Sequence, residues 1–164
     1  MQAWSEFTVI TGGAAAALVG LLFVAVSIRA EAIAGSTGLR SRLAQILTIF
    51  LALLTSCILV SLPNPAVWVL GIELIVASLI MAVAFIVLDR RAERSADQVP
   101  LERALDRLNP NVTTAVLIGL SGVALVFGFE AGLFLLALAS VVGFVGGAIG
   151  AWLVLVRSQE LDAP

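Results

Sequence analysis

The chain has 164 residues, of which 61% are hydrophobic and 12% charged, and its mean hydropathy is +1.14. A soluble domain is about 45–50% apolar and about 25% charged, so this excess of apolar residues indicates a lipid bilayer rather than a buried core alone. The sequence contains no histidine and no lysine. This argues against an enzyme with a nucleophile–base pair and against most zinc sites, so we expect no catalytic residues, no metal and no cofactor. Without a basic domain, we also expect no nucleic-acid partner.

Five apolar runs are long enough to cross a bilayer, which takes about 17–25 helical residues. They cover residues 7–28, 43–62, 66–88, 112–129 and 132–156. The second and third runs are separated by "LPNP", because two prolines in four residues cannot continue a helix. Between the fourth and fifth runs, "GFEAG" supplies a charge and flexible glycines for a tight turn. We therefore predict an all-α, polytopic membrane helix bundle of five spans, with residues 1–164 forming a single transmembrane domain.

The arginines predict how the chain is oriented. All nine fall in three places: after the first run, between the third and fourth runs, and after the fifth run. With five crossings, these three places share one side of the membrane, and connections rich in arginine face the cytoplasm. We therefore expect the N-terminus outside and the C-terminus in the cytoplasm. The first 28 residues have no basic n-region, so no cleaved signal peptide is expected.

The long connection between the third and fourth runs contains a helical pattern over residues 100–108. Leu101, Leu105 and Leu108 fall on one face, and charged residues occupy the rest. We predict a short cytoplasmic amphipathic helix. Two placements are open, one on the inner membrane surface and one docked against the ends of the bundle.

Small residues recur at helical spacing in the first and fifth runs. They are Gly12, Gly13, Ala16 and Gly20 in the first run, and Gly143, Gly146, Gly147 and Gly150 in the fifth. Helices in lipid associate through close backbone approach, which small residues permit. We therefore predict that these two helices are the most closely packed, either within one chain or between the copies of a homo-oligomer.

One ionisable residue, Glu73, lies inside the third run. It comes eight residues after Pro65, about 12 Å below the outer helix end at about 1.5 Å per residue. A charge inside a membrane is costly and usually faces protein or water. Ala66, Ala77 and Ala84 share its helical face. We expect Glu73 to point into the bundle or toward an oligomer axis, away from lipid.

Residues near the depth of Glu73 in the other runs are small or carry hydroxyl groups. Those with hydroxyls are Thr55, Ser56, Ser121 and Ser140, and we predict an ion or polar site among them, with Thr55 and Ser56 as hydrogen-bond partners of Glu73. At the outer end, Glu6 and Glu130 have no arginine to balance them and would form an acidic mouth that attracts cations. Alternatively, both acids are solvated end residues, and Glu73 makes a structural hydrogen bond or contacts a partner.

Three stretches carry a family resemblance: "WSEFTVITGGAAAALVGLLFVAVSI" near the start, "GIELIV" in the third run, and "AWLVLV" near the end. In this order they resemble an uncharacterised family of small bacterial integral membrane proteins, some of which are labelled modulators of the membrane protease FtsH. The resemblance implies a multi-pass protein of the bacterial cell (inner) membrane and marks Glu73 as a position of interest. It implies no established activity.

Two functional hypotheses follow. The first is a small self-assembling membrane protein, a channel-like or cation- or proton-conducting element with an outer-leaflet polar site at Glu73. The second is an accessory or regulatory subunit that binds another membrane protein, such as a protease or transporter, through its Gly/Ala faces. In both, the lipid bilayer is a partner.

Overall fold

The computed structural model describes residues 2–28, 30–62, 66–91 and 110–160. Within these ranges all regular structure is helical. The helices are α1 (Gln2–Ile28), α2 (Ala30–Ala34), α3 (Thr37–Ser61), α4 (Val67–Arg91), α6 (Pro110–Val126) and α7 (Gly132–Glu160). The predicted all-α class is therefore confirmed. The helix predicted over residues 100–108 lies outside the described residues.

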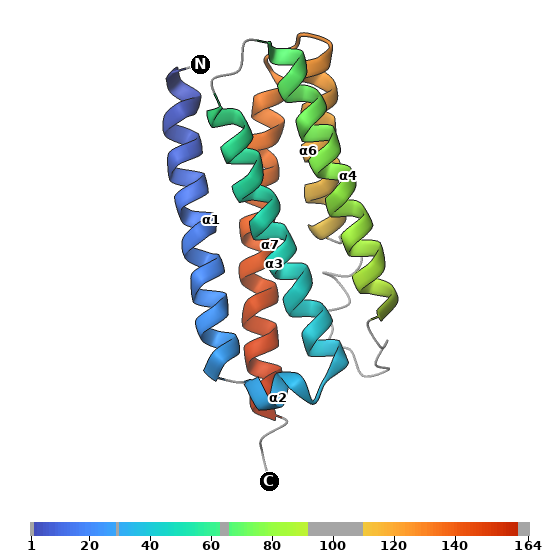
Figure 1. Cartoon of the computed structure of the whole chain (residues 1–164). Coiled ribbons are helices and arrows are strands. Elements are labelled where there is room, and N and C mark those ends of the chain that lie inside the picture. Colours follow the sequence, from blue (N-terminus) through green and yellow to red (C-terminus); the bar gives the residue numbers. More distant parts are fainter. Residues whose placement is uncertain (1, 29, 63–65, 92–109, 161–164) are drawn as a thin grey trace.

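The long helices run alternately up and down, and the two termini lie at opposite ends of the bundle (Figure 1). Helix α3 packs against α1, α4 and α7, whereas α6 packs against α4 and α7. Helix α1 is therefore attached mainly through α3 and contacts α7 only slightly. The most extensive contact is between α4 and α6. Within one chain, the expectation that the first and fifth runs are the most closely packed is thus wrong.

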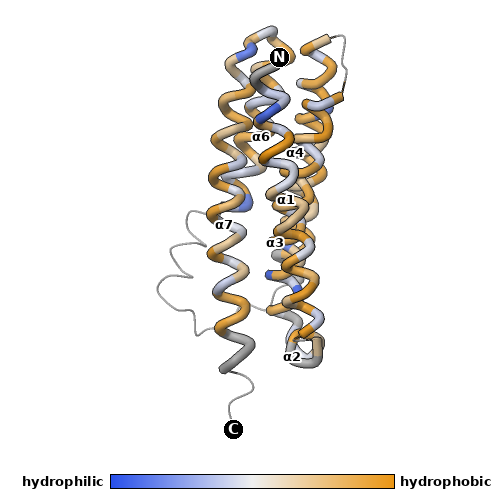
Figure 2. Tube along the Cα trace, turned by 90° about the vertical axis from the view of Figure 1, so that its left-hand side faces the viewer, coloured by the Kyte–Doolittle hydropathy of each residue, from blue (hydrophilic) through white to orange (hydrophobic). Residues whose placement is uncertain are grey.

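The bundle is apolar inside and outside. Its core contains large, fully buried side chains, among them Ile49, Phe50, Leu53, Leu74, Ile118, Leu125 and Leu136. Its surface carries exposed large hydrophobic side chains on every long helix, and Figure 2 shows hydrophobic residues along much of the long helices. A protein surrounded by water rarely exposes such continuous apolar surface. The outer surface is therefore suited to lipid.

Four helices are long and apolar enough to cross a membrane: Trp4–Ile28, Gly38–Ser61, Val67–Leu88 and Gly132–Val156. They coincide with four of the five predicted runs. The remaining run corresponds to α6, an apolar helix of 17 residues. At about 1.5 Å per residue it is about 26 Å long, somewhat shorter than the roughly 30 Å hydrocarbon core.

The ends of two helices follow local rules. Helix α3 starts at Thr37, six residues before the predicted boundary of 43, because Ser36 caps it: the Leu39 N–H donates to the Ser36 hydroxyl oxygen at 3.4 Å. The predicted tight turn between α6 and α7 is confirmed at residues 127–131. There Gly128 has φ of +81°, a left-handed conformation that glycine adopts without penalty.

Candidate functional site

Glu73 faces away from α6, and the reason lies two residues earlier in α4. Gly71 packs backbone-to-backbone on Gly122 of α6: a Cβ atom added at Gly71 would lie 2.6 Å from the Gly122 carbonyl oxygen. Leu74 is fully buried on the same side of α4. Two residues correspond to about 200° around a helix, so the contact at Gly71 turns Glu73 to the opposite side.

On that side, Glu73 lines an open groove between α3 and α4 with a volume of about 570 Å³, called here the α3–α4 groove. Its residues are Thr48, Leu51, Ala52, Thr55 and Leu59 of α3, and Ile72, Glu73, Val76, Ala77, Ile80, Met81 and Ala84 of α4. Of the three alanines expected to share the face of Glu73, Ala77 and Ala84 line this groove. Glu73 is half-buried and borders a groove that opens outward, rather than the centre of the bundle.

The carboxylate of Glu73 is incompletely satisfied. Its Oε2 atom is buried and has no hydrogen-bond partner in the part of the chain that the structure describes. Thr55 also lines the groove and is exposed. Thr48 also lines it, but its hydroxyl donates to the Ala44 carbonyl oxygen at 2.7 Å. A buried carboxylate oxygen without a partner is energetically costly, so this oxygen atom is the polar feature that distinguishes the groove.

The three serines of the predicted site lie in the core of the bundle and do not line the α3–α4 groove. Ser56 donates to the Ala52 carbonyl oxygen at 2.8 Å, and Ser140 donates to the Leu136 carbonyl oxygen at 2.9 Å, both within their own helices. Ser121 donates to the Gly132 carbonyl oxygen at 2.7 Å and joins α6 to α7. The structure therefore places Thr55 in the same groove as Glu73, without a hydrogen bond between Thr55 and the Glu73 Oε2 atom, and it places the serines outside that groove.

The two outer acids, Glu6 and Glu130, are exposed. Glu6 lies in α1 close to the N-terminus, and Glu130 lies in the α6–α7 turn at the same end of the bundle (Figure 1). Trp4 connects these regions, because its ring packs edge-to-face on Phe134 of α7 with centroids 5.2 Å apart. Glu130 also borders a small hollow beside Trp4.

The small residues that were predicted to mediate helix packing behave differently on α7 and on α1. On α7, Gly143, Gly146, Gly147 and Gly150 all pack against other helices, and a Cβ atom at any of them would lie 2.6–3.3 Å from a neighbouring side chain. On α1, Gly12 packs against Cys57, and a Cβ atom added at Gly12 would lie 3.3 Å from the Cys57 Cβ atom. Gly13 and Gly20 have open space around them, and Ala16 is exposed.

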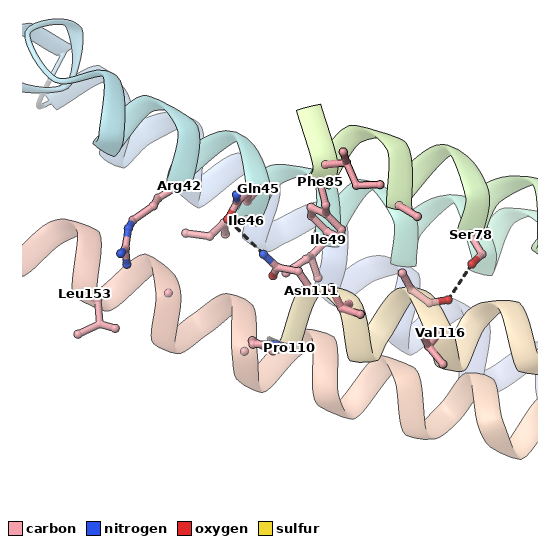
Figure 3. Close-up of a pocket in the computed structure, with 16 residues that line it drawn as sticks. Arg42, Gln45, Ile46, Ile49, Ser78, Phe85, Pro110, Asn111, Val116 and Leu153 are labelled. Atoms are coloured by element: carbon pink, nitrogen blue, oxygen red, sulfur yellow. Dashed lines mark hydrogen bonds between the residues drawn. The ribbon is translucent and has the colours of Figure 1, made fainter. Parts of the chain in front are cut away.

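Two features of the structure were not predicted from the sequence. One is the close contact of Gly71 with Gly122, although "LGIE" places a glycine two residues before the glutamate. The other is a cavity lined in part by Arg42, Gln45 and Asn111, shown in Figure 3. The sequence does contain one indication of this cavity, because Gln45 is a polar residue inside the second apolar run.

Within the described residues, no group of three or more His, Cys, Asp or Glu side chains is placed to hold a metal ion. No family model matches the chain, and neither a curated protein nor a solved structure matches it significantly. The fold therefore defines the class: an all-helical protein with several helices suited to a membrane.

Proposed function

We propose that this protein is a self-assembling membrane protein whose copies meet at the α3–α4 groove, where Glu73 forms part of a cation- or proton-conducting site. The observation that carries the proposal is the buried, unpartnered Oε2 atom of Glu73 in a groove that opens to the surroundings. An ionisable group at membrane depth is retained where protein or water can satisfy it.

A second copy of the chain can complete the groove, because the groove contains both the acceptor, Glu73, and a possible donor, Thr55. Copies inserted in the same orientation are related by an axis along the membrane normal, so residues of equal depth meet. Each Glu73 would then face the Glu73 and Thr55 side chains of the other copy. The Thr55 hydroxyl can donate to a carboxylate oxygen, and Ala77 and Ala84 allow the helices to approach closely.

Conduction, in this proposal, runs between copies. The centre of one chain is filled by side chains such as Phe50, Leu53 and Leu136, each at most 2% exposed. Among the described residues, this mainly apolar core favours a path between copies over a path through one chain. An interface with two Glu73 carboxyl groups would supply one, and Glu6 and Glu130 at the same end would raise the local concentration of cations.

We also propose how the chain is oriented. All five long helices cross the membrane, α6 being the shortest crossing, and the N-terminus lies outside and the C-terminus in the cytoplasm. Arg40 and Arg42 lie near the start of α3, at the end of the bundle assigned to the cytoplasm. The family resemblance supports a bacterial inner membrane.

A cross-linking experiment tests the interface. In a Cys57→Ala background, Thr55→Cys should form a disulfide-linked dimer on mild oxidation in membranes. Val123→Cys, which is exposed on α6 outside the groove, is the matched control and should cross-link much less. If both variants cross-link equally, or if the purified protein is strictly monomeric, the interface is elsewhere or absent.

Flux measurements test the conduction. Purified protein in liposomes should pass cations or protons, and Glu73→Gln should reduce the flux about tenfold or more, because the amide replaces the carboxyl group at the conducting site. Glu130→Gln removes an exposed acid that only raises the local cation concentration, outside the groove, and should therefore lower the flux much less. Absence of flux in the native protein would contradict conduction.

The same groove favours a second candidate, an accessory subunit that binds another membrane protein. Its outward opening and the small side chains of Ala52, Ala77 and Ala84 would accept a foreign transmembrane helix that carries a hydrogen-bond donor for Glu73. A partner that co-purifies with the native protein and is lost in Ala77→Phe, together with absence of flux, would favour this function.

A further inference from the structure

The oxygen atoms of the α3–α4 groove are confined to two levels. Of the described residues that line the groove, Thr48, Thr55 and Glu73 have side-chain oxygen atoms, and the others are apolar. Thr55 comes six residues before the end of α3, and Glu73 comes six residues after the start of α4. These two helix ends lie at the same end of the bundle (Figure 1), so both residues are about 9 Å from it at about 1.5 Å per residue. Thr48 lies about 10 Å deeper along α3 and belongs to a separate level.

A metal cation is poorly matched to the level of Glu73. A cation such as Ca²⁺ takes about six to eight oxygen ligands, and a channel that strips a cation of water replaces its hydration shell with rings of oxygen atoms. Each chain offers one carboxyl group and one hydroxyl group at this level, because the backbone carbonyl groups of α3 and α4 are bonded within their own helices. Two copies would therefore approach a cation shell only if every one of these oxygen atoms converged on the same point.

A single proton satisfies the same site with fewer groups. The Oε2 atom of Glu73 is buried and has no partner within the described residues. A carboxylate can only accept hydrogen bonds, whereas a protonated carboxyl group also donates one. If two copies bring their Glu73 side chains together, a proton on one carboxyl group makes a strong O–H···O bond to the other. The proton also removes one of two like charges from a groove with apolar walls.

We infer that the α3–α4 groove carries protons and excludes metal cations, and that two copies share one proton between their Glu73 carboxyl groups. The inference rests on the proposed function, in which copies meet at this groove. A proton that enters from one side binds to the free carboxylate, and the proton already held leaves toward the other side. The pair then again holds one proton, so transport needs no oxidant, reductant or other co-reactant.

The test compares two fluxes through the purified full-length protein in liposomes, under an inside-negative potential set by valinomycin and a potassium gradient. Entrapped pyranine should report proton uptake. An entrapped sodium-sensitive dye should report no sodium uptake above that of protein-free liposomes. Glu73→Gln should lower proton uptake about tenfold or more, because an amide of the same size cannot bind and release this proton. Glu73→Asp keeps a carboxyl group and should retain more of the uptake.

Infrared spectroscopy tests the shared proton separately. The spectrum of the native protein minus that of Glu73→Gln should contain the C=O band of a protonated carboxyl group, and this band should shift in deuterated water. Sodium uptake that depends on Glu73, proton uptake without the band, or equal losses in Glu73→Gln and Glu73→Asp would each overturn the inference and leave conduction at the groove in place. Absence of both fluxes would instead overturn the proposed function. Circular dichroism establishes that each variant compared is folded.

Discussion

At the scale of single residues, two glycines decide where the side chain of Glu73 points. Gly71 and Gly122 let the backbones of α4 and α6 touch, and a Cβ atom on either one would lie 2.6 Å from the carbonyl oxygen of the other. This contact fixes the rotation of α4 about its own axis. Glu73 consequently faces the α3–α4 groove, where its Oε2 atom lacks a partner among the described residues.

Gly71→Ala should therefore destabilise the protein, because its new methyl group meets backbone that cannot move aside. We expect a loss of about 1–3 kcal/mol, typical of overpacking. Unfolding in mixed detergent micelles, followed by circular dichroism, measures it. Gly13→Ala is the control: nothing lies within 4 Å, so its stability should be unchanged or raised by up to about 1 kcal/mol through helix propensity. Equal effects of the two substitutions would contradict the close α4–α6 contact.

At the scale of elements, the α6–α7 hairpin is the most completely specified connection. The Phe129 N–H donates to the Ala124 carbonyl oxygen at 2.9 Å, and the Gly128 N–H donates to the Leu125 carbonyl oxygen at 3.0 Å. These two bonds, with Gly128 in the left-handed conformation, form a Schellman motif that ends α6. Ser121 adds a hydrogen bond from α6 to the first residue of α7.

Gly128→Ala tests this connection without a steric clash, since nothing lies within 4 Å of the position that a Cβ atom would occupy. The cost is conformational: a left-handed residue with a side chain loses about 1–2 kcal/mol. We expect a loss of this size in the same unfolding assay. Asparagine tolerates this conformation better, so Gly128→Asn should lose less than Gly128→Ala. The reverse order would argue against the motif.

At the scale of the whole molecule, the alternating helices place Glu6 and Arg40 at opposite ends of the bundle, which makes the proposed orientation testable. The native Cys57 is buried, and Cys57→Ala provides a cysteine-free background. In that background, Glu6→Cys should react with a membrane-impermeant maleimide in intact bacterial cells. Arg40→Cys should react only after the cells are permeabilised. The opposite labelling pattern would show that the chain has the inverse orientation. Labelling of both cysteines in intact cells would show that the chain does not cross the membrane an odd number of times between residues 6 and 40.

The sequence by itself determined the class of protein and the approximate position of every long helix. Hydropathy, prolines and the "GFEAG" turn act locally, so they can be read without knowing what packs where. Four long apolar helices and the shorter α6 fall on the predicted runs. The capping hydroxyl of Ser36 extends α3 beyond its apolar run, which hydropathy alone does not register.

Only the tertiary structure decided which way each helix faces. In a soluble helix one apolar stripe marks the buried side, but here nearly every face is apolar and that signal is weak. The small residues of α1 and α7 therefore looked equivalent in sequence, although Gly147 packs on Phe50 while Gly13 and Gly20 have open space. For the same reason, depth alone grouped Ser56, Ser121 and Ser140 with Glu73. Rotation about the helix axes, set by contacts such as Gly71 on Gly122, separates the serines from the groove and keeps Thr55 in it.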